Sequence, residues 1–133
     1  KTAGGPAKIA VISSGLYGTI SGSPTSDVVT TGAITIPIMK RLGYKASFAG
    51  GVEVAASTGG SLLPPVMGAA AFIMAEYTGI PYRHIALAAI IPAILFYLPI
   101  YLQVHLRAVK TGLKGLRPDE IPGLRKTLSK GWL

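Results

Sequence analysis

Hydroxyl-bearing and helix-breaking residues gather at two points of an otherwise apolar chain. The first point is SGSPTSDVV at residues 21–29, and the second is STGGSLLPPVMG at residues 57–68. A helix that ends inside a membrane leaves main-chain carbonyls without partners, and a helix that begins there leaves N–H groups. Carbonyl ends attract cations and N–H ends attract anions. The two interruptions are therefore candidates for binding a small cation together with a carboxylate.

Two acidic residues belong to the same part of the chain. Asp27 falls in the first turn expected after the first interruption, where a carboxylate stabilises the helix dipole or serves as a cation or proton ligand. Glu53 lies in GGVEVAAS, and no other charged residue occurs between Ala46 and Ala75. Ionisable groups inside a membrane are costly and usually functional. Glu53 is therefore a candidate proton carrier, with binding to a neighbouring helix as the alternative.

Other kinds of chemistry find little support. Cysteine is absent, and His84 and His105 have no partners at metal-ligand spacing. The glycines of GLYGTISGS are not followed by the Gly-Lys-Ser/Thr of a phosphate-binding loop. No Ser/His/Asp or Cys/His arrangement stands out. We therefore expect neither an enzyme nor a bound cofactor, and no metal beyond a Na⁺ ion.

The composition is that of a membrane protein rather than of a soluble domain. Hydrophobic residues make up 50% of the chain and charged residues 14%, with a mean hydropathy of +0.51. Soluble domains carry about 25% charged residues. The formal net charge is +8, but the basic residues form short runs between apolar stretches. This distribution lacks the basic stripe with interleaved aromatics that is typical of nucleic-acid binding.

The first interruption divides an apolar segment at residues 9–39. As one helix this segment would be about 46 Å long at 1.5 Å per residue. That is too long for one crossing of ~30 Å of hydrocarbon and too short for two. A re-entrant helical hairpin at about residues 9–39 fits best, since irregular backbone at membrane depth is tolerated where protein or water surrounds it. Pro24 ends the first arm, and Thr25 or Ser26 is expected to cap the second.

The second interruption divides the next apolar segment, residues 46–77. Two glycines followed by two prolines are expected to stop one helix and start another. This pattern predicts helices at 46–59 and 65–77 with an unwound stretch between them. The segment is then one discontinuous transmembrane helix.

The clearest transmembrane helix is predicted at residues 84–106, HIALAAIIPAILFYLPIYLQVHL, which carries no formal charge. Pro92 and Pro99 are expected to kink it. The basic runs place the open end of the hairpin and the end of the last helix in the cytoplasm. Residues 1–110 are then part of a transporter membrane domain, and residues 111–133 form a basic cytoplasmic connector or a surface-lying segment. Because the chain starts without Met, we expect it to be a piece of a longer polypeptide.

Two stretches carry a resemblance to a known family. GTISGSPTSDVVTTGAITIPIMKRLGY and ASTGGSLLPPVMGAAAFIMAEYTGIPY resemble the large membrane subunit of tripartite ATP-independent periplasmic (TRAP) transporters. The resemblance covers roughly residues 5–110 and is strongest to the subtype with fused small and large membrane parts, usually served by a TAXI-type binding protein. It implies an all-α membrane protein and a fragment of an elevator-type transport domain, whose second re-entrant hairpin lies outside these residues.

The resemblance also implies residue roles. It places a cation near Ser21 and the carbonyls of Gly60, Leu63 and Pro65, and it places the substrate beside the tip Ser21-Gly22-Ser23. Pro24 and Asp27 depart from the small or uncharged residues expected after that tip. Asp27 and Glu53 are the positions considered for proton coupling.

The resulting hypothesis is ion-gradient-driven secondary uptake of an organic acid across the bacterial inner membrane by a multi-pass protein, coupled to Na⁺ or H⁺. The implied partners are a periplasmic substrate-binding protein, a small membrane subunit or its fused equivalent, and the remainder of the same permease. The alternatives are an ion channel that uses the hairpin as a filter and a soluble basic binding module.

Overall fold

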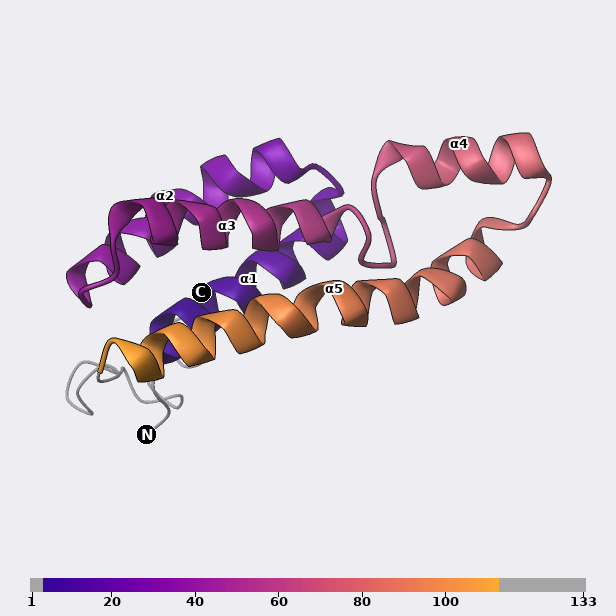
Figure 1. The fold of residues 1–133 in the computed structure, drawn as a ribbon. Coiled ribbons are helices and arrows are strands. Elements are labelled where there is room, and N and C mark those ends of the chain that lie inside the picture. Colours follow the sequence, from indigo (N-terminus) through magenta and orange to yellow (C-terminus); the bar gives the residue numbers. More distant parts are fainter. Residues whose placement is uncertain (1–3, 113–133) are drawn as a thin grey trace, which may run out of the picture.

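The computed structural model describes residues 4–112, and all regular secondary structure in that range is helical. The helices α1, α2 and α3 pack against one another, α5 lies along α1 and α3, and α4 leaves this bundle and returns to α5 (Figure 1). In chain order the helices are α1 (Gly5–Ser21), α2 (Pro24–Arg41), α3 (Ala46–Gly60), α4 (Ala69–Thr78) and α5 (Tyr82–Lys110). The predicted all-α class is confirmed for this range.

A helix–turn–helix occupies the region predicted as a hairpin, and its arms are longer than residues 9–39. Gly22 ends α1 in a left-handed conformation with φ of 59°, and its N–H donates to the Gly18 carbonyl at 3.0 Å. Pro24 is the first residue of α2, where its missing N–H has no helical partner to lose. Ser23 therefore takes the N-cap position, and the prediction of Thr25 or Ser26 as the cap is wrong.

The break between α3 and α4 is longer than the sequence predicts. The second helix begins at Ala69 rather than at residue 65. Met67 has a φ of 58°, and Gly68 is extended with φ of −81° and ψ of 165°, so the chain cannot be helical directly after the prolines. Gly59 and Gly60 are the last residues of α3. The helix end predicted at residue 59 is therefore confirmed to within one residue. The two glycines also permit close packing of α3 on its neighbours.

The helix α5 contains the predicted transmembrane segment and runs without interruption through Pro92 and Pro99. Within residues 4–112 it is the one helix long and apolar enough to cross a membrane. Large apolar side chains cover its outer surface: Leu87, Ile91, Ile94, Leu95 and Leu98 are all more than half exposed. A surface of this kind is typical of contact with lipid or with further helices.

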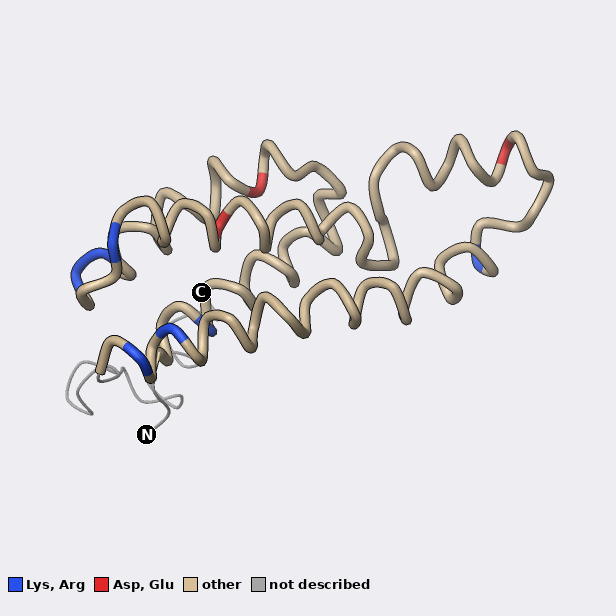
Figure 2. Tube along the Cα trace, viewed as in Figure 1, with Lys and Arg blue, Asp and Glu red and all other residues tan. Residues whose placement is uncertain are grey.

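Basic residues gather at one end of the molecule. Figure 2 shows Lys and Arg where α2 ends, α3 begins and α5 ends, with acidic residues elsewhere. At the opposite end it shows one basic residue, Arg83, where α5 begins. Lys40 and Arg41 lie in the last turn of α2, and Arg107 and Lys110 in the last turn of α5. This arrangement agrees with the one-sided distribution of charge on which the predicted orientation depends. Of the connector predicted at residues 111–133, residues 113–133 lie outside the described part of the chain.

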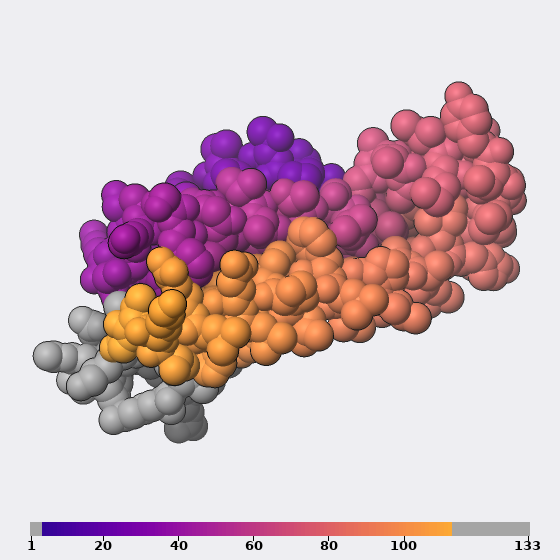
Figure 3. Space-filling model, viewed as in Figure 1, coloured from indigo at the N-terminus to yellow at the C-terminus, as the bar shows by residue number. Residues whose placement is uncertain are grey.

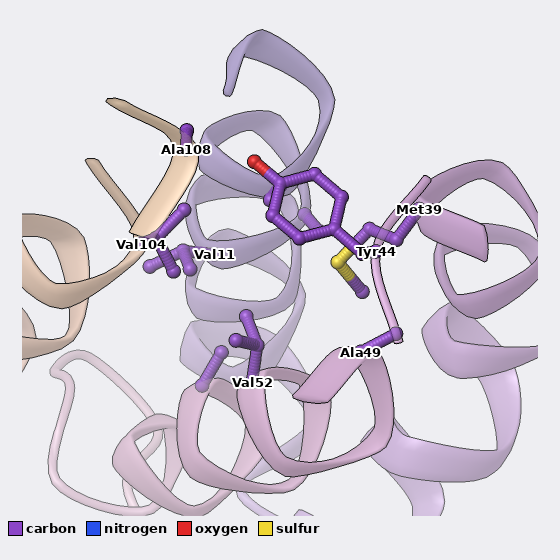
Figure 4. Close-up of a cluster of buried hydrophobic side chains, with 10 residues drawn as sticks. Val11, Met39, Tyr44, Ala49, Val52, Val104 and Ala108 are labelled. Atoms are coloured by element: carbon purple, nitrogen blue, oxygen red, sulfur yellow. The ribbon is translucent and has the colours of Figure 1, made fainter. Parts of the chain in front are cut away.

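Small side chains bring the helices of the bundle together near this basic end. The cluster labelled in Figure 4 includes Val11, Ala49, Val52, Val104 and Ala108, all buried between α1, α3 and α5. Met39 and Tyr44 close it on the side of the α2–α3 loop. Burial raises the pKa of Tyr44 above its ordinary value.

A polar contact also joins α1 to α5. Lys8 is buried, and its Nζ donates to Nδ1 of His105 at 2.9 Å while standing 5.3 Å from the ring centroid of Tyr101. The bundle and the C-terminal half of α5 therefore form one packed unit. The N-terminal half of α5 projects past the bundle together with α4 (Figure 3).

Candidate cation and substrate site

The tip of the hairpin and the break between α3 and α4 are in direct contact. The N–H of Val66 donates to the Thr19 carbonyl at 3.2 Å. A Cβ on Gly22 would lie 2.0 Å from the Met67 carbonyl oxygen, and Gly22 also has a positive φ. Only glycine fits both conditions. The two interruptions noted in the sequence therefore form one region of the structure.

Asp27 points into this region from the first turn of α2. Its side chain is fully buried, and the Ser21 hydroxyl donates to Oδ1. Among the described residues, Oδ2 has no hydrogen-bond partner. A Cβ on Gly18 would stand 3.1 Å from Oδ2, and a Cβ on Gly60 would stand 2.9 Å from it. The open oxygen of Asp27 thus lies where α1 and α3 cross.

The electrostatics of that crossing favour a cation. Gly18 belongs to the last turn of α1, and Gly60 is the last residue of α3. Both helices therefore direct the negative ends of their dipoles toward the carboxylate. A buried carboxylate oxygen without a donor is costly unless a proton or a cation satisfies it. The crossing can accept positive charge by either route.

Two of the three carbonyls predicted as cation ligands, those of Gly60 and Pro65, accept hydrogen bonds at the break. The Gly60 carbonyl accepts the N–H of Leu63 at 3.2 Å. The Tyr82 hydroxyl lies 2.8 Å from the Pro65 carbonyl oxygen and 2.5 Å from the Val66 carbonyl oxygen. Each carbonyl oxygen has two lone pairs, so these bonds leave one acceptor position on each. The cation-binding roles of Gly60, Leu63 and Pro65, and the substrate role of Ser21-Gly22-Ser23, stay predictions.

Glu53 occupies a separate polar site inside the bundle, which we call the hydroxyl cage. It consists of Glu53 and four hydroxyl residues, namely Ser14 of α1, Thr31 and Thr35 of α2, and Ser57 of α3. The Ser14 hydroxyl donates to Oε1 at 2.7 Å, and Ser57 approaches the same oxygen at 3.5 Å. Thr31 and Thr35 donate to Oε1 and Oε2. The fully buried carboxyl group therefore connects three helices.

The hydroxyl protons of the cage are fewer than the contacts they could serve. The hydroxyl of Thr31 lies 2.7 Å from the Asp27 main-chain carbonyl and 3.0 Å from the Ser14 hydroxyl, besides its contact with Glu53. Thr35 likewise lies 3.0 Å from the Thr31 carbonyl besides contacting Glu53. A hydroxyl donates one proton. The cage can therefore accommodate a proton on the carboxyl group as well as an ionised carboxylate.

Sequence reasoning identified both carboxylates and missed most of their partners. Thr31 and Thr35 are four residues apart and so share a face of α2, a signal that was available. Ser14 offered no comparable signal. Tyr97 of α5 donates its hydroxyl to the Ala56 carbonyl at 2.6 Å. Its ring lies against Gly15 and Gly59, which ties α5 to the crossing of α1 and α3.

Comparison with known proteins places the chain in a family. A family model described as "Tripartite ATP-independent periplasmic transporter, DctM component" matches residues 1–133. The C4-dicarboxylate TRAP transporter large permease protein DctM of Pseudomonas aeruginosa is 28% identical over 130 residues, covering 98% of this chain and 28% of that protein. The protein of the same name from Vibrio cholerae is 30% identical over 128 residues, covering 94% of this chain and 26% of that protein. No solved structure matches the chain significantly.

The chain thus spans little more than a quarter of the length of these two relatives. Both are transporter permeases, in agreement with the expectation that the chain is a membrane transport protein and not an enzyme. The channel and the soluble basic module lose their support. The resemblance seen in the two interruptions extends over the whole chain, and the chain belongs to the DctM family, the large membrane subunit of TRAP transporters.

Proposed function

We propose that the permease containing this chain carries out ion-gradient-driven uptake of an organic acid across the bacterial inner membrane. A periplasmic binding protein delivers the substrate, and a small membrane subunit or its fused equivalent completes the membrane part. The two relatives are named for C4-dicarboxylates, so these acids are the first substrates to test. Assignment to the fused subtype with a TAXI-type binding protein belongs to the same proposal.

The observation that carries the proposal is the open Oδ2 of Asp27 at the crossing of α1 and α3. We place the coupling cation beside this oxygen, with the Ser21 hydroxyl and the carbonyls of Gly60, Leu63 and Pro65 as further ligands. Na⁺ prefers oxygen ligands of this kind, as hard cations do. The carboxylate supplies the charge, and the ends of the two helices supply partial charges.

The substrate carboxylate is placed beside the tip formed by Ser21, Gly22 and Ser23. The first N–H groups of α2 favour an anion there, whereas the charge of Asp27 opposes it. A bound cation removes this opposition. The proposed order is therefore cation first and substrate second, which couples uptake to the ion gradient.

The proposed motion is that of an elevator. The arms α1 and α2 have 17 and 18 residues, or about 26 Å each at 1.5 Å per residue. They fall short of the ~30 Å of hydrocarbon, which supports a re-entrant hairpin whose tip lies inside the membrane. In this proposal the hairpin and the broken helix move together relative to a fixed scaffold.

Proton coupling at Glu53 is the second candidate mechanism. It is favoured because the cage has fewer hydroxyl protons than hydrogen-bond contacts, so the carboxyl group has room for a proton of its own. In that case the carboxyl group gains and loses the proton during transport. Asp27 would then bind no ion and would serve its helix dipole.

Reconstituted uptake separates the two candidates. The full-length permease with its binding protein is placed in liposomes, and uptake of C4-dicarboxylates is followed under a Na⁺ gradient and then under a pH gradient. Under the first candidate, Asp27→Asn and Ser21→Ala lose Na⁺-driven uptake and Glu53→Gln retains it. Ser26→Ala, an exposed hydroxyl in the same turn, is the matched control. Proton-driven uptake that disappears in Glu53→Gln would overturn the Na⁺ assignment, and no uptake under either gradient would overturn secondary transport.

A further inference from the structure

A groove opens between the start of α3 and the last turns of α5. Its volume is about 740 Å³. One wall is apolar and is formed by Phe48 together with Pro99, Leu102 and Leu106 of α5. Leu102 and Leu106 are 48% and 65% exposed, so the wall is accessible over much of its length. The groove is separate from the Asp27 crossing and from the hydroxyl cage, since it shares no residue with either.

The mouth of the groove is basic. Lys45, Arg107 and Lys110 line it, and they lie at the end of the molecule where Lys and Arg gather in Figure 2. The three carboxylates of the described residues are elsewhere: Asp27 and Glu53 are buried in the bundle, and Glu76 belongs to α4. The positive charge at the mouth is therefore uncompensated by these carboxylates.

Two further features make this mouth suited to an anion. The guanidinium of Arg107 lies 5.5 Å from the centroid of the Phe48 ring, a cation–π contact that orients it beside the groove. The helix α3 begins here without a side-chain cap, and Ser47 of its first turn lines the groove. The first N–H groups of an uncapped helix add partial positive charge.

The combination of a basic mouth and an apolar wall selects an amphipathic ligand. A free phosphate or a nucleotide would bind the basic side chains and leave the apolar wall of the groove exposed to solvent. A neutral lipid would use the wall and leave the cations without a counter-charge. An anionic phospholipid satisfies both, and basic sites between helices at the cytoplasmic face of a membrane are suited to such headgroups.

We propose that this groove binds an anionic phospholipid. Its phosphate lies between Lys45, Arg107 and Lys110, and one acyl chain follows Phe48, Leu102 and Leu106. The lipid then bridges α3 to α5 at the basic end. This binding does not depend on which ion drives transport.

The test measures lipid retention by the full-length permease. The protein is exchanged into mixed micelles that contain equal amounts of phosphatidylglycerol and phosphatidylcholine, and bound lipids are counted by native mass spectrometry. We expect the triple variant Lys45→Gln/Arg107→Gln/Lys110→Gln to lower phosphatidylglycerol affinity roughly 100-fold. The control variant Lys40→Gln/Arg41→Gln/Arg83→Gln removes the same charge from residues that do not line the groove, and it should retain the lipid.

Each other outcome overturns the proposal. Equal loss in the two triple variants would indicate a general attraction to positive charge rather than a site. Displacement of the lipid by soluble glycerol phosphate would indicate a small-anion site. Absence of phosphatidylglycerol from the wild-type protein would show that another part of the permease fills the groove. Thermal unfolding of both variants verifies that they are folded, and none of these readouts involves transport.

Discussion

Two buried carboxyl groups lie in the same helical bundle, and their surroundings differ. Glu53 is surrounded by hydroxyls from α1, α2 and its own helix α3. Asp27 receives one hydroxyl on Oδ1 and has an open Oδ2 at the crossing of α1 and α3. Both are fully buried. Burial alone therefore does not identify the functional carboxylate. The number of hydroxyls around each oxygen distinguishes Glu53, whose two oxygens both have partners, from Asp27, whose Oδ2 has none among the described residues.

The comparison has an energetic meaning. Hydrogen bonds to a charged group contribute about 1.5–3 kcal/mol each, and a buried group without a partner costs a similar amount. Glu53 should therefore stabilise the bundle, whereas Asp27 should add stability through its open Oδ2 only when a cation or a proton arrives. Stability measurements can separate these roles independently of transport.

The largest effect is expected from Gly60→Ala, which acts on the crossing at Asp27. The added Cβ would lie 2.7 Å from the Gly18 Cα and 2.9 Å from Asp27 Oδ2. Main chain cannot move aside as a side chain can, so α1 and α3 must separate. We expect a loss of about 3 kcal/mol in the free energy of unfolding, measured by thermal unfolding of the full-length permease in detergent.

Gly50→Ala is the matched control for this change, because it lies in the same helix and no other part of the protein beyond its own helical turn comes within 4 Å of the added Cβ. It should be neutral or stabilise by up to ~1 kcal/mol through helix propensity. Equal unfolding temperatures for Gly60→Ala and wild type would show that the crossing is looser than described.

The second effect is expected from Glu53→Gln. The amide keeps the shape of the side chain, but its NH₂ group faces hydroxyls that donate toward it, so one bond of the cage is lost. We expect a cost of about 2 kcal/mol in the same unfolding measurement. Thr35→Val, which removes one donor, should cost about 1 kcal/mol, and Thr30→Val on the exposed face of α2 should cost little. A negligible cost for Glu53→Gln would indicate that the carboxyl group already carries a proton, in favour of the second candidate.

The smallest effect is expected from Asp27→Asn in the absence of Na⁺. The amide oxygen can still accept the Ser21 hydroxyl, and the NH₂ group replaces an oxygen that lacked a donor. The free energy of unfolding should change by less than ~0.5 kcal/mol. With Na⁺ at 100 times its dissociation constant, the wild-type protein should gain about 2.7 kcal/mol and the variant should gain nothing. Equal stabilisation of both proteins by Na⁺ would remove Asp27 from the cation site.

Much of the fold follows from local patterns in the sequence. The apolar segments and their interruptions predicted the helical hairpin, the broken helix and the long helix α5, because those features depend on residues near one another in the chain. The start of α4 was predicted too early since the left-handed conformation of Met67 accompanies its contact with Gly22, which is distant in sequence. The second role of Gly59 and Gly60 was missed for the same reason, because their close contacts with α5 and α1 are tertiary contacts.

The sequence identified the main polar residues of the candidate site but not the contacts between them. Ser21, Asp27 and Glu53 stood out because polar residues are rare in apolar segments. The grouping of Ser14, Thr31, Thr35 and Ser57 around Glu53 depends on how three helices pack, and the open oxygen of Asp27 depends on the crossing of Gly18 and Gly60. Spacing along one helix cannot reveal contacts of that kind.

The contact between Gly18 and Gly60 also has a mechanical consequence. Side chains at an interface can change rotamer and let two helices slide, but two glycine main chains in contact have no such freedom. The distance between α1 and α3 at this crossing, next to the proposed ion, is therefore expected to stay fixed. A change of access to that ion must then come from displacement of the hairpin and the broken helix as one body, or from rotation about this point, and not from local repacking around Asp27.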